Sequence, residues 1–378
     1  MKILCVNAGS SSLKFQLYDM PAEISIIGGY VEKIGAPDSF YTIKYEGKKT
    51  ETAKPIKDHA EAAKIMLEEL INYGAVEDLE EIRGVGHRVL HGGEKYAKSV
   101  VIDEQVLKDI KDLTKLGPLH HPGNIAGIKA MQKALPNATQ VAVFDTAFHQ
   151  TIPKVQFMYP VPMEWYEKYG VRKYGFHGTS HKYITEVMQK KLGKEKVNLI
   201  VCHVGSGASI TAVKDSKSYD TTMGLTPLDG LMMGTRSGSI DPSIIKYMID
   251  EAGMTYDEVD EALNKKSGLK GVCGYNDNRD VVNYALNRIE VYFVSLYASR
   301  IIITSSLVGS TYTGTVESSA VIMPLVISLK LAIASFTSLL ILIPNGAKPL
   351  MIDSRVSAPF SSTPAVNTMA STSPPSSR

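Results

Sequence analysis

The hydrophobic pattern at the start of the chain predicts a β-hairpin. A short apolar run at residues 3–6 is followed by a Gly/Ser-rich stretch at residues 7–12, and then by alternating apolar and polar residues at 13–18. This order is typical of two antiparallel strands joined by a turn. Gly9 lets the turn approach a ligand closely, and its N–H groups and hydroxyls suit phosphate oxygens. An ordinary Ser-rich turn explains the stretch equally well by itself.

Further strands are expected in a first lobe, residues 1–147. Residues 39–45 alternate as a half-buried strand does, and residues 84–90 read as a buried strand. Residues 140–144 form another buried-strand run, and Asp145 follows at its carboxyl end. Ligand sites of α/β sheets gather at such ends.

A helix is predicted over residues 58–74. Asp58 can act as its N-cap, Glu61 follows three residues later, and Gly74 suits the C-terminal stop. A rigid turn at residues 118–124 precedes a second helix, and its two adjacent histidines are weak candidates for metal ligands because no third ligand has useful spacing. The expected apolar stripe of the first helix consists of Ala63, Met66, Leu67, Leu70 and Ile71.

The second lobe, residues 148–286, repeats the design of the N-terminus. Residues 197–202 are expected to form an apolar strand, and residues 203–209 a turn rich in Gly and Ser. Residues 210–213 are expected to form the second strand of the hairpin. Upstream of them, Ser180 is expected to cap a helix. Downstream, residues 264–268 and 276–280 are polar loops suited to the sugar or base of a nucleotide. Two such hairpins facing each other would hold the phosphates of a nucleotide from both sides of a cleft.

Four residues are candidates for chemistry. Arg88 lies inside an apolar run, where arginine is seldom found without an anionic partner. It predicts either an internal ion pair or a fork for a carboxylate or phosphate. Asp145 is a candidate for the ligand site, and the cap of a helix or turn is the alternative interpretation. Arg236 lies among small residues, and His177 stands beside a glycine where it could donate to a transferring group.

Composition excludes some classes of function. The chain has 378 residues, of which 39 are acidic and 41 basic, so it lacks the basic excess of nucleic-acid-binding proteins and membrane-surface anchors. Its three cysteines are far apart and odd in number, which fits a reducing compartment. No basic-then-apolar signal segment opens the sequence. We therefore expect a cytoplasmic protein with small-molecule substrates and neither a nucleic-acid nor a membrane partner.

The composition changes abruptly after residue 286. Residues 1–286 hold 36 acidic and 35 basic residues, whereas residues 287–378 hold 3 and 6 and contain 18 serines. Residues 320–343 are apolar and long enough to span a membrane, but a proline and Lys330 interrupt them. Residues 361–378 are rich in Ser, Thr and Pro and are expected to be disordered. Residues 287–378 are therefore treated as a divergent segment.

Several motifs, taken in order, resemble the acetate kinase family. They lie between Met1 and about residue 285, at residues 7–14, 86–88, 144–146, 176–181 and 233–236. The resemblance implies an α/β fold of two lobes around a nucleotide cleft, as in acetate and sugar kinases, Hsc70 and actin. It also implies reversible, direct in-line transfer of a phosphoryl group from ATP to acetate, giving ADP and acetyl phosphate. The implied cofactor is Mg²⁺, with Mn²⁺ as an alternative. The implied assembly is a homodimer.

The resemblance also implies roles for individual positions. Asn7 looks like the magnesium contact, Arg88 like the substrate-binding arginine and Asp145 like the active-site acid. His177 and Arg236 look like stabilisers of the transition state. The positions that resemble nucleotide contacts are Lys14, His203, Val204, Gly205, Ser206, Gly207, Asp277, Asn278 and Arg279. The serine at 206 replaces a more usual asparagine.

The divergent segment departs from the family pattern. A Gly-rich loop over the adenine and a late Pro-Thr-Asn-Glu-Glu stretch, whose Glu would reach magnesium, are missing from residues 287–378. The second lobe is therefore expected to be incomplete and destabilised by several kcal/mol. Besides an acetate kinase, the sequence leaves open a nucleotide-binding pseudo-enzyme or inactive truncated chain, and a membrane-tethered chimera.

Overall fold

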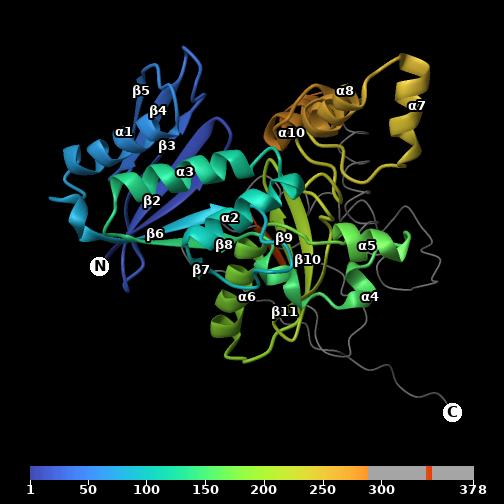
Figure 1. Ribbon diagram of the computed structural model, residues 1–378, viewed down its shortest axis with the longest axis horizontal. Helices are drawn as coiled ribbons and strands as arrows, with labels where there is room; N and C mark the ends of the chain where they lie inside the picture. Colours follow the sequence, from blue (N-terminus) through green and yellow to red (C-terminus); the bar gives the residue numbers. More distant parts are fainter. Residues whose placement is uncertain (288–337, 343–378) are drawn as a thin grey trace.

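Two β-sheets organise the computed structural model, which describes residues 1–287 and 338–342 (Figure 1). The first sheet has the strand order β5-β4-β3-β2-β1-β6-β8-β7, and the second has the order β11-β10-β9-β12. The strands are β1 Lys2–Ala8, β2 Ser12–Asp19, β3 Ile24–Glu32, β4 Phe40–Tyr45, β5 Lys48–Ala53, β6 Ile82–Val89, β7 Val100–Val101, β8 Thr139–Phe144, β9 Leu199–Val204, β10 Ala208–Lys214, β11 Lys217–Thr221 and β12 Ser338–Leu342.

Helices cover the sheets and connect their strands. Figure 1 shows α1 and α3 side by side on the first sheet, and α6 packs on β9 of the second. The helices are α1 His59–Asn72, η1 Leu79–Glu81, α2 Glu104–Asp112, η2 Leu113–Leu116, α3 His121–Ala134, η3 Ala147–Thr151, α4 Lys154–Phe157, α5 Met163–Tyr169, α6 Gly178–Leu192, α7 Ser243–Ala252, α8 Tyr256–Glu261, the π-helical η4 Ala262–Lys266, α9 Gly268–Cys273 and α10 Asn278–Asn287.

The N-terminal hairpin predicted from the sequence is confirmed. Strands β1 and β2 pair antiparallel, with Asn7 opposite Lys14 near the turn. The turn closes through a hydrogen bond of 2.8 Å from the N–H of Gly9 to the carbonyl of Ser12. Beyond this hairpin, β1, β6 and β8 run parallel, so their carboxyl ends lie at one edge of the sheet.

The helix predicted over residues 58–74 is α1. The Asp58 carboxylate accepts a hydrogen bond of 2.8 Å from the N–H of Glu61, as expected of an N-cap. The carboxylate of Glu61 accepts instead from the N–H of Lys57, at 2.9 Å. One member of the expected stripe is wrong, because Ile71 is 44% exposed while Met66 and Leu70 are buried in the core beneath the sheet.

The second hairpin is also confirmed. Strands β9 and β10 pair antiparallel, with Val204 opposite Ala208 across the turn. The helix expected to follow a cap at Ser180 starts earlier, because α6 begins at Gly178 and His177 occupies its N-cap position. Ser180 lies inside the first turn, so the prediction of its role as cap was wrong.

Two predictions fall largely on residues outside the described ones. The expected disorder of residues 361–378 lies entirely there, as does the apolar stretch 320–343 except for β12, which pairs with β9. Within residues 1–287 and 338–342, no helix combines the length and the apolar character needed to cross a bilayer.

Candidate active site

Three of the candidate residues gather at one edge of the first sheet. Asn7 is near the end of β1, Arg88 near the end of β6, and Asp145 directly after β8. Since these strands are parallel neighbours, their last residues converge on the same side. The sheet topology therefore brings together side chains that lie far apart in the sequence.

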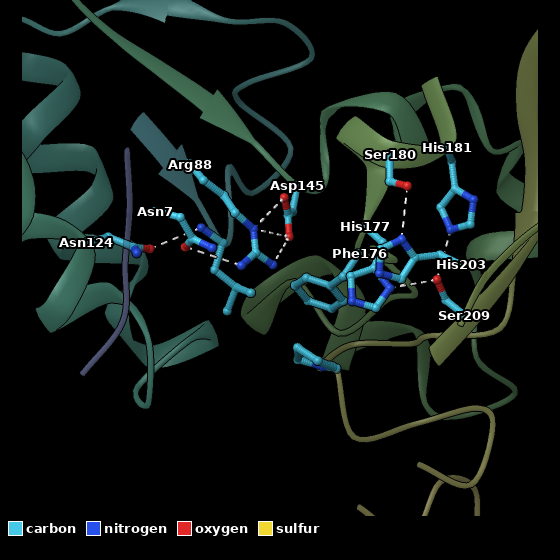
Figure 2. Close-up of polar contacts among 12 residues, drawn as sticks. Asn7, Arg88, Asn124, Asp145, Phe176, His177, Ser180, His181, His203 and Ser209 are labelled. Atoms are coloured by element: carbon cyan, nitrogen blue, oxygen red, sulfur yellow. Dashed lines mark hydrogen bonds and ion pairs between the residues drawn. The ribbon is translucent and has the colours of Figure 1, made fainter. Parts of the chain in front are cut away.

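Arg88 and Asp145 form a bidentate ion pair (Figure 2). The Nη2 of Arg88 is 2.6 Å from Oδ2 of Asp145, and its Nε is 3.1 Å from both carboxylate oxygens. The negative charge of Asp145 raises the pKa of Arg88. Its Nη1 remains on the other side and donates at 3.4 Å to Oδ1 of Asn7.

Arg88 has the anionic partner that the sequence predicted, but its own side chain is less buried than expected. Its carboxylate partner Asp145 is 2% exposed, but the side chain of Arg88 is 42% exposed. The reason is the alternation of β6, which buries His87 and Val89 and directs residue 88 to the open side. The guanidinium therefore has an internal ion pair and also a free edge towards a cavity.

This cavity has a volume of about 750 Å³ and receives side chains from both halves of the chain. The first hairpin contributes Asn7, Ser10, Ser12 and Lys14, and Lys265 of η4 comes from the second half. Among the described residues, Lys14 forms no ion pair. The remaining lining residues are Ala8, Gly9, His59, Arg88, Leu90, Pro118, Leu119, His120, Pro122, Gly123, Asn124 and Ala126.

Helix α3 supports the Gly/Ser turn between β1 and β2. The contacts come from two residues near the start of the helix. At Gly123 an added Cβ would lie 2.3 Å from the carbonyl oxygen of Gly9, so only glycine allows this approach. Asn124 is buried and bridges two strand ends, donating to the carbonyl of Ala8 at 2.6 Å and accepting from the N–H of Leu90 at 3.1 Å. The helix thus fixes the Gly/Ser turn relative to β6.

His177 is joined to the first sheet through its neighbour in the chain. The N–H of Gly178 donates at 2.9 Å to the backbone carbonyl of Asp145. A Cβ at Gly178 would lie 2.2 Å from that oxygen. His177 itself has a left-handed backbone with φ of 59°, which is unusual for a residue with a side chain. The charges of Asp145 and Arg88 act on the pKa of His177, so the imidazole lies near the strand ends.

The imidazole of His177 is neutral. Burial, with the neighbouring His203 as the next cause, lowers the pKa of His177 to about 3. The two rings lie 4.1 Å apart between centroids. A neutral imidazole in this position can donate one hydrogen bond to an anion.

The second Gly/Ser turn lies beside His177 and Arg236. A Cβ placed on Gly207 would be 3.5 Å from Nη2 of Arg236 and 3.5 Å from Cε1 of His177. The loop before Arg236 packs on this turn, because the N–H of Gly234 donates at 3.1 Å to the carbonyl of Ser206. The turn therefore faces both candidate stabilisers.

Arg236 has no carboxylate partner among the residues that the structure describes. Its Nη1 donates to the carbonyl oxygen of Pro227 at 2.9 Å. Burial lowers the pKa of Arg236, and the positive charge of Arg88 lowers it further. Two arginines whose charges repel each other form a site that suits an anion between them.

The candidate adenosine loop, residues 277–279, does not line the cavity. Asp277 and Arg279 pair with each other, with Nη2 of Arg279 at 2.5 Å from Oδ2 of Asp277, and Arg279 is largely exposed. Neither these residues, Asn278 nor the second Gly/Ser turn lines the 750 Å³ cavity. The loop is nevertheless close to the site, since a Cβ on Gly234 would lie 2.6 Å from the carbonyl of Asn276.

Sequence reasoning did not assign His59, His120 or Asn124 to the site, and it placed Lys265 only in a polar loop. Burial and the positive charge of Arg88 lower the pKa of His120 to about 4. The rigid turn at residues 118–124 was recognised, but its two histidines were considered only as metal ligands. Lys265 belongs to a polar loop expected to face the sugar or base, and nothing in its spacing indicated the cavity.

Comparisons with known proteins agree with this geometry. The model of the acetokinase family matches residues 2–309. The acetate kinase of Bacillus cytotoxicus is 56% identical over 284 residues, which cover 74% of this chain and 72% of that protein. The acetate kinase of Bacillus subtilis is 54% identical with the same coverage. The chain belongs to the acetokinase family. The family match extends beyond residue 285, where the resemblance noted in the sequence ended.

Solved structures of the acetokinase family share the fold. A propionate kinase from Francisella tularensis superposes with a TM-score of 0.78 at 40% identity, covering 88% of each chain. Acetate kinase from Porphyromonas gingivalis gives a TM-score of 0.73 at 39% identity, covering 81% of this chain and 80% of that one. The predicted α/β, actin-like fold is thereby confirmed.

Proposed function

We propose that this chain catalyses reversible transfer of the γ-phosphoryl group of ATP to acetate, giving ADP and acetyl phosphate. The observation that carries the proposal is the Arg88–Asp145 ion pair in a member of the acetokinase family. Arg88 lines the cavity, and the charges of Asp145, Arg88 and Arg236 all act on the nearby His177. Acetate is proposed as the acyl substrate because relatives at 54–56% identity are acetate kinases.

The first role is to bind the carboxylate. Acetate is ionised at neutral pH, so its oxygen can attack phosphorus without a general base. We propose that the free edge of Arg88 binds acetate and that Asp145 holds the guanidinium in place. The two-point contact between them supports this, because it leaves the guanidinium little freedom to rotate.

The second role is to stabilise charge during transfer. Phosphoryl transfer depends mainly on positioning and on neutralising the equatorial oxygens. Arg236 supplies a positive charge that no described carboxylate neutralises, and the neutral His177 supplies an N–H. We propose that with Arg88 they surround the phosphoryl group during its in-line transfer from the nucleotide to acetate.

Nucleotide binding is proposed at both Gly/Ser turns. The first provides Lys14 and the N–H groups around Gly9, and the second provides His203, Val204, Gly205, Ser206 and Gly207. Asp277, Asn278 and Arg279 are proposed on the adenosine side. We propose that the nucleotide lies between a lobe of residues 1–147 and one of residues 148–286, and that the enzyme acts as a cytoplasmic homodimer.

The oxygen donors of the cavity fit a hydrated Mg²⁺ ion. Asn7, Ser10 and Ser12 line the same cavity, and Asn7 Oδ1 has only a long contact of 3.4 Å from Arg88 Nη1. Both Asp145 oxygens are engaged by Arg88. Such a set suits an ion held mostly by phosphate oxygens and water, with Asn7 as a protein contact. When bound with ATP, Mg²⁺ or Mn²⁺ would neutralise phosphate charge.

A hydroxamate assay tests the proposal directly. The full chain is incubated with ATP, Mg²⁺ and acetate, and acetyl phosphate is trapped by hydroxylamine. Hydroxamate should form with the wild type and fall at least about 100-fold in the Arg236→Ala variant. ATP binding without hydroxamate would contradict the proposal and favour the pseudo-enzyme, an alternative that the family match and the relatives do not support.

A further inference from the structure

A buried serine connects two histidines next to the proposed site. Ser209 on β10 is fully buried, and its Oγ is 2.8 Å from Nδ1 of His177 and 2.8 Å from Nε2 of His181. Figure 2 shows the serine hydroxyl contacting both imidazoles. A hydroxyl has only one hydrogen to donate, so the two contacts cannot have the same direction if that hydrogen is used here.

The protonation of His181 sets one of these directions. His181 is fully buried, and burial lowers its pKa well below 6.5, so the ring is neutral and has a single N–H. Its Nδ1 is buried and has no hydrogen-bond partner among the described residues. Both tautomers leave this nitrogen unpaired, but a buried N–H without an acceptor is rarer in proteins than an acceptor with an unused lone pair. The proton therefore resides on Nε2, which donates to Ser209 Oγ.

The direction of the second contact follows from the first. Ser209 Oγ accepts from His181, and within the described part of the chain the nitrogen of His177 is the acceptor that its hydrogen can reach. Ser209 thus donates to Nδ1 of His177. Because burial keeps His177 neutral as well, its single proton must be on Nε2.

We propose that His181 and Ser209 are positioning residues that hold His177 as the Nε2-protonated tautomer, with its N–H available to the transferring phosphoryl group. This inference rests on the proposed function. In the other tautomer a nitrogen lone pair would face phosphate oxygens and repel them. The chain of contacts thus ensures that the site offers a donor, without requiring a charged imidazole.

Neighbouring histidines have hydrogen-bond partners of their own. His203 contacts Ser180 through Nδ1 at 2.9 Å. His149 contacts Ser218 through Nδ1 at 2.8 Å and the carbonyl of Phe176 through Nε2 at 2.9 Å. Ser218 is buried like Ser209 and also contacts an imidazole Nδ1, but that imidazole is not His177. It offers a matched control.

The decisive measurement is nitrogen NMR of the full chain labelled with ¹⁵N-histidine. A His177→Gln variant identifies the two ring resonances of His177 among the nine histidines. We expect the wild type to have a protonated Nε2 and an unprotonated Nδ1 that is shifted by an accepted hydrogen bond. A protonated Nδ1 in the wild type would overturn the proposal, whatever the variants do.

Serine variants then test the connection. In Ser209→Ala, the Nδ1 resonance of His177 should move to that of a free imidazole nitrogen, and kcat should fall about tenfold to 100-fold with a smaller change in KM. Ser218→Ala should leave that resonance in place. An unchanged resonance in Ser209→Ala would refute the connection. The spectra need no turnover, so a chain without acetyl phosphate formation would refute the proposed function while the tautomer could still be observed.

Discussion

The guanidinium of Arg88 and the carboxylate of Asp145 meet across the ends of two adjacent parallel strands, with Nη2 and Oδ2 only 2.6 Å apart. The carboxylate of Asp145 is buried, whereas the side chain of Arg88 is partly open to the cavity. This asymmetry fits the proposed roles, in which Asp145 holds the guanidinium and Arg88 contacts the substrate. It leads to different expectations for substitutions at the two positions.

Asp145→Asn should retain acetate binding and lose turnover. The amide oxygen can still accept one hydrogen bond from Arg88, but the charge that fixes the guanidinium is lost. We expect kcat to fall on the order of 10²–10³ and KM for acetate to change only a few-fold. Steady-state kinetics with the hydroxamate assay measure both, and full turnover in the variant would refute the role given to Asp145.

Arg236→Ala should have a much lower kcat and a nearly unchanged KM. Its guanidinium is held by a backbone carbonyl and repelled by Arg88, so its favourable interaction develops with the charge of the transition state. Loss of one such donor costs on the order of 10²–10³ in rate. Arg236→Lys should recover part of this, because it restores charge without the planar fork. A large rise in KM at constant kcat would instead assign Arg236 to ground-state binding.

Gly123→Ala should disrupt the first turn. The new methyl group would lie 2.3 Å from the carbonyl oxygen of Gly9 and 2.9 Å from the nitrogen of Ser10, so helix or turn must move. We expect a loss of about 1–3 kcal/mol in the free energy of unfolding, with weaker ATP binding. Gly86→Ala is the matched control, since nothing lies within 4 Å of its added Cβ. Urea unfolding and ATP titration of both variants check this, and equal behaviour would contradict it.

Stability should fall as the pH decreases from about 6.5 to 4. Burial lowers the pKa of His149 to about 4, so in this window the unfolded chain binds a proton that the folded chain does not. The stabilising contribution is therefore complete above pH 6.5 and is lost on acidification, by on the order of 3 kcal/mol. His149→Gln should show a smaller pH dependence in urea unfolding. Parallel pH profiles for the two proteins would rule out His149 as the cause.

Local patterns predicted much of the fold and part of the site. Both hairpins are where apolar runs flank small residues, because β-pairing across a short turn is determined by neighbours in the chain. The exposure of Ile71 and the start of α6 at Gly178 depend on tertiary contacts, which such patterns do not contain. Lys265 was assigned only to a polar loop for the same reason, since only the fold brings it to this cavity.

The hydrogen bond between Gly178 and the backbone of Asp145 has a mechanical consequence. It fastens the start of α6 to the end of β8 without room for any intervening atom. Any movement of the two sheets relative to each other that preserves this hydrogen bond must be small at this junction. The spacing between Asp145 and His177 would then stay nearly constant during such a movement.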